Sequence, residues 1–156
     1  MNSKTKIFIT GGTFDKEYNE LTGELYFNST HMHELLKLGR CNVNVDIETL
    51  MMVDSLDMAE SQRNIIVQKC IKEPLNAIII THGTDTMVET AHALAKNIKN
   101  KTIILTGAMI PFKFGSSDGL FNMGSALAYV QSVNKGIYIA MNGQIFNYEN
   151  VKKILN

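Results

Sequence analysis

Three short segments of the chain end in the same way. Residues 7–12 read IFITGG, residues 78–83 read IIITHG and residues 103–108 read IILTGA, so each apolar run closes in Thr before small or turn-forming residues. The stretches of chain between them differ in length, which argues against a stacked repeat. We therefore interpret them as three strands that stop at one edge of a sheet. In open α/β sheets, ligands bind at the carboxyl ends of parallel strands, so we expect a site at this edge.

Short apolar runs alternate with longer amphipathic stretches along the chain. The apolar runs predict strands near 5–10, 42–49, 76–81, 101–106 and 136–141. The amphipathic stretches predict helices near 30–38, 57–72, 87–98 and 118–133. In the last two of these segments helical spacing gathers the apolar side chains on one face: Met87, Ala91, Leu94 and Ile98, then Leu120, Met123, Leu127 and Val130. This order predicts an α/β fold: a three-layer, doubly wound, mainly parallel sheet of Rossmann or flavodoxin type, with helices on both faces and a C-terminal hairpin as an option.

Length and charge balance narrow the class of protein. A chain of 156 residues fits one domain, taken as residues 1–156. Lys and Arg number 15, as do Asp and Glu, so the basic excess typical of a nucleic-acid binder is missing. We find no signal peptide and no apolar segment of membrane-spanning length, and we expect no membrane partner. Cys41 and Cys70 lack metal-ligand spacing and fit buried free thiols in a cytoplasmic protein.

The segment THGTDTMVE at residues 81–89 begins at the end of the strand predicted near 76–81 and carries several polar side chains. Thr86 followed by Glu89 predicts a capping box at a helix start. Thr84 and Asp85 are not needed for that cap, and they precede a helix N-terminus, where an anionic ligand is favoured. For these two residues, a functional and a structural role stay equally open. His82 is interpreted as a packed or hydrogen-bonded histidine rather than a ligand.

TGGT at residues 10–13 is neither a dinucleotide-binding fingerprint nor a P-loop, which would need a GK[ST] ending. Its two glycines permit a sharp turn and let a ligand approach the backbone closely. Thr13 would then project just beyond the strand. A plain turn explains the glycines equally well, so this segment alone does not define a site.

Three further segments have mainly structural interpretations. Ser55 precedes a predicted helix and is expected as its N-cap, with Asp57 in the first turn. The loop at 106–119 ends in Ser and Asp, which again suits a helix start. The HMH at 31–33 has metal-like spacing but sits in a predicted helix without a third ligand, so we expect no metal there, and no cofactor.

What remains is a collection of hydroxyls and one carboxylate at a shared sheet edge. No Ser-His-Asp order or reactive-cysteine signature matches. A hydroxyl nucleophile needs a base, and lysine can serve where burial and neighbours lower its pKa. The sequence alone does not identify which residue acts as that base.

Together these loops resemble the bacterial-type L-asparaginase family. The matching segments are TGGT at 10–13, DS at 54–55, THGTDTM at 81–87, TGAM at 106–109, GSSDG at 115–119 and the tail MNGQIFNYENVKK at 141–153. The likeness runs in order along essentially the whole chain. It implies hydrolysis of L-asparagine to L-aspartate and ammonia through a threonine acyl-enzyme.

The resemblance also implies catalytic roles for named residues. Thr13 matches the nucleophile, and Thr84, Asp85 and Lys153 match the residues thought to transfer protons. Asp85 would receive the substrate's α-amino group, and the backbone N–H groups of Thr13 and Thr84 would form the oxyanion hole. Tyr18 matches the tyrosine of a mobile lid.

Substrate binding follows from the same likeness. Ser55 would grip the α-carboxylate together with the Gly83–Thr84 backbone, and Ala108 would hold the amide nitrogen through its carbonyl. Gly12 and Asp54 complete the predicted binding set.

This sequence also departs from the family. Members are usually about twice as long, with a C-terminal domain that lends the neighbouring subunit an acidic residue. We expect that domain to be absent, which makes the chain a single-domain relative or an incomplete member. If the missing acid is replaced, Glu17 or Glu20 is the candidate. Lys153 is the lysine expected to face the site, and the alternative is Lys152 or neither.

Several functions stay open on this basis. The chain could hydrolyse glutamine or another small amide, or it could be a catalytically weak module that binds aspartate or asparagine. The neutral surface and the family likeness both favour a homodimer or homotetramer.

Overall fold

The computed structural model describes residues 3–151, so Lys152 and Lys153 lie outside the described residues. The strands are β1 (Thr5–Gly11), β2 (Lys16–Tyr18), β3 (Leu25–Phe27), β4 (Val45–Val53), β5 (Ala77–Thr81), β6 (Thr102–Thr106), β7 (Gly136–Met141) and β8 (Gln144–Asn147). The α-helices are α1 (Met32–Leu38), α2 (Glu60–Lys72), α3 (Met87–Asn97) and α4 (Gly119–Val130). Short 3₁₀ turns separate them: η1 (Thr13–Asp15), η2 (Ser55–Asp57), η3 (Phe112–Phe114) and η4 (Tyr148–Asn150).

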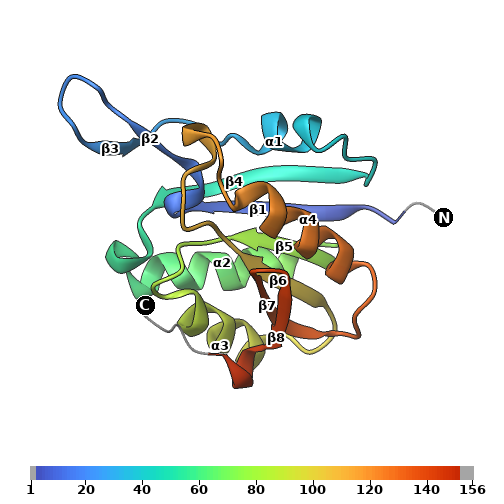
Figure 1. Cartoon of the computed structure of the whole chain (residues 1–156). Helices are drawn as coiled ribbons and strands as arrows, with labels where there is room; N and C mark the ends of the chain where they lie inside the picture. Colours follow the sequence, from blue (N-terminus) through green and yellow to red (C-terminus); the bar gives the residue numbers. More distant parts are fainter. Residues whose placement is uncertain (1–2, 152–156) are drawn as a thin grey trace.

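Six strands form one sheet in the order β4-β1-β5-β6-β7-β8 (Figure 1). Strands β4, β1, β5, β6 and β7 run parallel, and β8 is antiparallel to β7. Taken in chain order, the parallel strands have the flavodoxin-like order 2-1-3-4-5. The strand order therefore switches between β1 and β5, and this is where such sheets bind ligands. The predicted α/β class and the C-terminal hairpin are both confirmed.

Helices cover both faces of the sheet because the strands alternate their side chains between two cores. Phe8 of β1 packs in the core that includes apolar residues of α2 and α3. Its neighbours Ile7 and Ile9 pack in the opposite core, which includes residues of α1 and α4. The central strands β5 and β6 are apolar on both faces, as expected of a buried parallel sheet. The three-layer prediction is confirmed.

Some predicted boundaries are wrong. The second predicted strand, at 42–49, is found at Val45–Val53, because β4 continues alongside β1 until Val53 lies beside Gly11. The helix predicted from residue 57 begins at Glu60, where the Gln62 side chain accepts a hydrogen bond of 2.8 Å from the Ala59 N–H.

The hairpin formed by β2 and β3 was not predicted. It extends away from the main sheet at the upper left of Figure 1.

A buried lysine lies near the start of β1, at the amino end of the sheet. The ammonium of Lys6 is 2.9 Å from Asp46, 3.1 Å from Glu48 and 3.5 Å from Glu73. Burial by itself would lower the pKa of Lys6, but these carboxylates outweigh it and raise that pKa. The cluster therefore joins β1, β4 and the end of α2 at the edge opposite the expected site.

Other expectations concern metals, thiols and membranes. His31 immediately precedes α1, and within residues 3–151 no three His, Cys, Asp or Glu side chains gather as a metal site. Cys41 and Cys70 are free thiols, with Cys70 buried as predicted and Cys41 only half-buried. No helix in the described part of the chain is long and apolar enough to cross a bilayer.

Candidate active site

Close contacts between glycines bring three of the predicted loops together at the switch point. Gly12, directly after β1, has φ 76° and ψ −179°. A Cβ on Gly12 would lie 2.5 Å from the backbone nitrogen of Gly83, after β5. A Cβ on Gly83 would in turn lie 2.5 Å from Ser55 Oγ. Only glycine permits this packing, which brings the loops that carry Thr13, Ser55 and Thr84 into contact.

The loop after β6 joins the same edge. A Cβ on Gly107 would lie 2.4 Å from the carbonyl oxygen of His82, and Ala108 is buried beside it. Two side chains near the start of α4 hold this loop: Asn122 donates to the Gly107 carbonyl at 2.9 Å, and Asp118 accepts from the Met109 N–H at 2.9 Å. The prediction that these loops share one sheet edge is confirmed.

Thr13 opens the 3₁₀ turn η1 and is half-buried. Phe14 and Asp15 behind it are fully buried. The Asp15 carboxylate accepts hydrogen bonds from the His31 N–H at 2.8 Å and from the Thr30 hydroxyl at 3.0 Å. Burial raises the pKa of Asp15, although these hydrogen bonds oppose the rise. Asp15 therefore anchors the Thr13 turn to the start of α1, a role that sequence reasoning missed.

The prediction that Ser55 is the N-cap of a helix is wrong. Ser55 lies inside η2 with 1% of its surface exposed, and the carboxylate of Asp54 caps that turn by accepting from the Leu56 N–H at 3.1 Å. The Ser55 hydroxyl instead accepts from the Thr86 N–H at 3.3 Å. This bond ties the loop after β4 to the loop after β5.

The capping box predicted at Thr86 and Glu89 is wrong as well. Thr86 is the N-cap residue of α3, but its side chain makes no capping hydrogen bond. Its hydroxyl donates to the carbonyl of Ser55 at 2.9 Å. Of the two residues left open beside it, Thr84 is half-buried with its hydroxyl 3.7 Å from Met109 Sδ, and Asp85 is exposed.

The β2–β3 hairpin borders this edge. Lys16 forms an ion pair with Asp54, which belongs to the predicted binding set. Tyr18, the predicted lid tyrosine, is 53% exposed, and its ring meets the Phe114 ring edge-on at 6.3 Å. The proposed substitute acids differ in surroundings: Glu17 lies 3.7 Å from His31, whereas Glu20 is exposed.

His82 is packed and hydrogen-bonded, as predicted. Its Nδ1 is 2.8 Å from the Gly83 carbonyl oxygen, and its Nε2 is 2.7 Å from the Thr90 hydroxyl. Burial lowers the pKa of His82 to about 4, so the imidazole is neutral near pH 7. The Thr90 hydroxyl also accepts from Arg63 Nε at 2.9 Å. Neither Arg63 nor Thr90 was singled out from the sequence.

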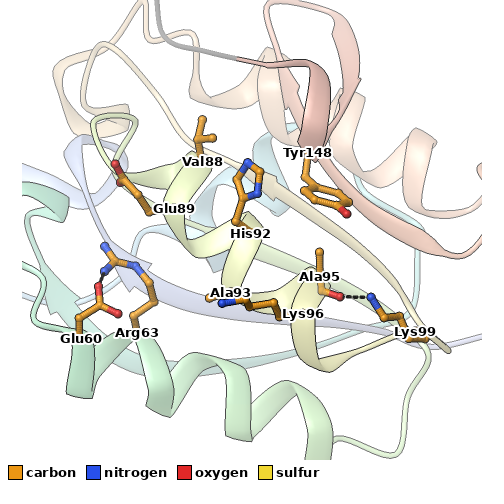
Figure 2. Close-up of a pocket in the computed structure, with 10 residues that line it drawn as sticks. All are labelled: Glu60, Arg63, Val88, Glu89, His92, Ala93, Ala95, Lys96, Lys99 and Tyr148. Carbon is orange, nitrogen blue, oxygen red and sulfur yellow. Dashed lines mark hydrogen bonds and ion pairs between the residues drawn. The ribbon is translucent and has the colours of Figure 1, made fainter.

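A cavity of about 570 Å³ lies elsewhere, on the outer side of α2 and α3 (Figure 2). Its lining includes His92, whose ring meets Tyr148 edge-on at 5.1 Å, and the salt bridge between Glu60 and Arg63. None of the predicted site residues lines it. The buried guanidinium of Arg63 is the connection between this cavity and the strand edge.

The chain is an open, flavodoxin-ordered α/β protein in which glycine contacts join the loops that carry Thr13, Ser55 and Thr84 at the topological switch point. The family model described as "Asparaginase, N-terminal" matches residues 4–156, and the chain belongs to the asparaginase family. The resemblance of its loops to that family is thereby confirmed.

Individual relatives agree with this assignment. The chain is 42% identical to a glutaminase-asparaginase of Acinetobacter glutaminasificans over 58% of its length, and 35% identical to L-asparaginase 2 of Escherichia coli over 70%. It matches the solved thermostable L-asparaginase from Thermococcus kodakarensis with a TM-score of 0.81 and 26% identity over 93% of the chain. The matched regions span 29% and 33% of the two curated relatives and 46% of the solved chain.

Proposed function

We propose that the chain is an amidohydrolase that converts L-asparagine to L-aspartate and ammonia. The observation that carries the proposal is the packing of Gly12 on Gly83 and of Gly83 on Ser55. It gathers a candidate nucleophile, a candidate oxyanion donor and a candidate carboxylate grip at the switch point of the sheet. The relatives named L-asparaginase support the same reaction.

The proposed chemistry begins at Thr13. Its hydroxyl oxygen attacks the side-chain amide carbon of asparagine while its proton passes to a base, and the backbone N–H groups of Thr13 and Thr84 stabilise the oxyanion. The C–N bond then breaks, the nitrogen takes up a proton and leaves as ammonia, and an ester to Thr13 remains. Water attacks that ester, releasing aspartate and restoring the hydroxyl.

Proton transfer is assigned by family likeness to Thr84, Asp85 and Lys153, the last of which lies outside the described residues. The Ala108 carbonyl would hold the leaving amide nitrogen, and its burial beside Gly107 supports a fixed orientation. No step in this scheme calls on a metal or an organic cofactor.

Substrate recognition divides between two loops. Ser55 and the backbone at Gly83 would hold the α-carboxylate, and the exposed carboxylate of Asp85 would receive the α-ammonium group. A small zwitterion needs both contacts, because its two charges must be matched when it leaves water.

Glutamine is the second candidate substrate, because a matching relative is a glutaminase-asparaginase. One methylene in a pocket changes discrimination by only about 1–3 kcal/mol. Comparing kcat/KM for asparagine and glutamine on the same preparation decides between the two.

Ammonia release from L-asparagine is the decisive measurement. Thr13→Val removes the hydroxyl but keeps the shape and should abolish turnover, whereas Thr13→Ser keeps a hydroxyl and should retain part of it. Lys153→Ala tests the assignment of the tail. Absent wild-type turnover, together with a melting temperature raised by aspartate or asparagine, would reject hydrolysis and favour a binding module.

Self-association is part of the proposal. Apolar side chains are exposed on the hairpin and on the loop after β6, including Leu21, Leu25, Met109 and Phe114. The hairpin meets η3 where the ring of Tyr18 packs on Phe114, and exposed apolar side chains at such a junction favour contact with another protein surface. Light scattering across a dilution series distinguishes a homodimer or homotetramer from a monomer.

A further inference from the structure

Arg63 of α2 is a buried cation, and each of its three guanidinium nitrogens contacts a side-chain oxygen. Its side chain is 7% exposed and it forms a salt bridge with Glu60, as Figure 2 shows. It also donates from Nε to the Thr90 hydroxyl at 2.9 Å and from Nη2 to the Thr86 hydroxyl at 3.2 Å. Burying a guanidinium is costly unless every side of it is matched. The Glu60 pair offsets that cost on one side, and the two threonines are hydrogen-bonded in turn to His82 and to Ser55.

The direction of each hydrogen bond in the first branch follows from simple chemistry. The Gly83 carbonyl can only accept, so His82 Nδ1 carries a proton and donates to it at 2.8 Å. The neutral imidazole then has a lone pair on Nε2, and the Thr90 hydroxyl donates to it at 2.7 Å. Because that hydroxyl proton is committed, Arg63 Nε–H donates to the Thr90 oxygen. The order is therefore Arg63 to Thr90 to His82 to Gly83.

The second branch reaches the neighbouring loop. Arg63 donates to the Thr86 hydroxyl, which donates in turn to the Ser55 carbonyl at 2.9 Å. One guanidinium is thus joined to the loop after β4 and to the loop after β5.

The end of the first branch matters most for the proposed reaction. The Gly83 carbonyl and the Thr84 N–H belong to one planar, trans peptide unit, so they point in opposite directions. The hydrogen bond from His82 Nδ1 fixes the Gly83 carbonyl oxygen, and it therefore sets the direction of the Thr84 N–H. That N–H is one of the two proposed oxyanion donors.

We propose that Arg63, acting through Thr90 and His82, is a positioning residue that orients the Gly83–Thr84 peptide for oxyanion binding. The proposal rests on the proposed function for its catalytic consequence. Its structural part, the locked tautomer of His82 and the fixed peptide plane, is testable without any turnover.

The matched pair of variants is Thr90→Val and Thr90→Ser. Valine keeps the shape of threonine but removes both the donor to His82 and the acceptor for Arg63. We expect Thr90→Val to lower kcat for asparagine about tenfold or more, short of the 10²–10³ that loss of an oxyanion donor costs, with a smaller change in KM. Thr90→Ser keeps the hydroxyl and should restore kcat to within about twofold of the wild type.

NMR of the uniformly ¹⁵N-labelled protein, observed at the His82 ring nitrogens and at the Thr84 amide, supplies the readout that does not depend on activity. In the wild type and in Thr90→Ser, His82 should be the Nδ1–H tautomer, and the Thr84 amide should have the same chemical shift in both proteins. In Thr90→Val the tautomer population and the Thr84 amide signal should both move. If the wild type releases no ammonia while these shifts occur, the proposed function fails and the positioning chain stands.

Other outcomes overturn the proposal. Thr90→Val with a lower melting temperature but unchanged kcat and KM, measured well below that temperature, would show a purely structural role. An unmoved Thr84 amide in the same variant would have the same meaning. Should Thr90→Val fail to fold, Arg63→Lys takes its place, because one ammonium cannot reproduce the guanidinium fork. Wild-type kcat in Arg63→Lys, with an unmoved Thr84 amide, would then reject the chain.

Discussion

Replacing Gly12 with alanine should damage both the stability and the activity of the chain. The backbone there has φ 76° and ψ −179°, a region that is essentially restricted to glycine and costs other residues about 1–3 kcal/mol. The new Cβ would also lie 2.5 Å from the nitrogen and 2.6 Å from the Cα of Gly83. Neither atom is the end of a flexible side chain, so the overlap adds about 1–3 kcal/mol. The expected loss of unfolding free energy is therefore about 2–6 kcal/mol.

Two other glycines separate these effects. Gly115 has nearly the same backbone angles, φ 77° and ψ 159°, but nothing lies within 4 Å of its would-be Cβ. Gly115→Ala should therefore show the conformational cost alone. Gly124, in the exposed part of α4, has neither problem, and Gly124→Ala should stabilise the chain by about 0.5–1 kcal/mol.

Urea denaturation of the three variants gives the stabilities, and ammonia release from asparagine gives the activities. A misplacement of about 1 Å at a reacting centre can lower a rate 10²-fold, so Gly12→Ala should lose most of its turnover while still folded. Equal stability losses in Gly12→Ala and Gly115→Ala would refute the contact with Gly83. Full activity in folded Gly12→Ala would refute its importance for the site.

Acid should destabilise the chain through His82, since burial holds its pKa at about 4 against an ordinary 6.5. The unfolded state binds the proton first, so the free energy of unfolding falls by on the order of 3 kcal/mol as the pH drops from about 6.5 to about 4. Urea titrations at several pH values measure this fall. An equal fall in the His82→Gln variant would contradict the prediction. Lys6→Met should cost about 1–2 kcal/mol of stability by leaving three carboxylates without their shared cation, and an unchanged urea midpoint would count against this reasoning. Burial raises the pKa of Cys70 to about 12, so mass spectrometry should find alkylation of Cys41 well before Cys70, and equal rates would disprove it.

The shared edge of the sheet was predictable because its signal is local. Three of the strands that form it, β1, β5 and β6, are apolar runs that close in a threonine, and parallel strands place such ends together. Two of these threonines have a structural role, because their hydroxyls bond to neighbouring strands. Thr10 donates to the Thr81 carbonyl at 2.6 Å, and Thr106 donates to the Ala140 carbonyl at 2.7 Å. Several of the predicted site residues lie two or three positions beyond the threonines that close β1, β5 and β6: Gly12, Thr13, Gly83, Thr84 and Ala108.

Other parts of the site were not predictable because they depend on contacts distant in sequence. Ser55 and Thr86 both carry good capping signals, but each satisfies the other, which no local pattern reveals. Arg63 lies in a mainly polar helix, where an arginine ordinarily faces solvent. Only the packing of α2 against α3 buries it beside Thr90.

The hairpin was missed for the opposite reason, since its signal is weak rather than misleading. Its strands have three residues each, and Tyr18 and Leu25 are paired while both remain largely exposed. Periodicity does not identify strands that short.

The position of β1 at the switch point has a consequence for how the protein folds. This strand pairs on one side with β4 and on the other with β5, and the bond from Thr10 to Thr81 spans 71 residues. Such distant pairings must overcome the entropy of closing long loops before they contribute any stability, and they slow the folding of parallel sheets. Because Gly12 meets Gly83 at the end of that same pairing, the candidate site can form only when the pairing of β1 with β5 is complete. A folding intermediate in which only β5, β6 and β7 had paired would therefore contain much of the hydrophobic core but would lack the candidate site.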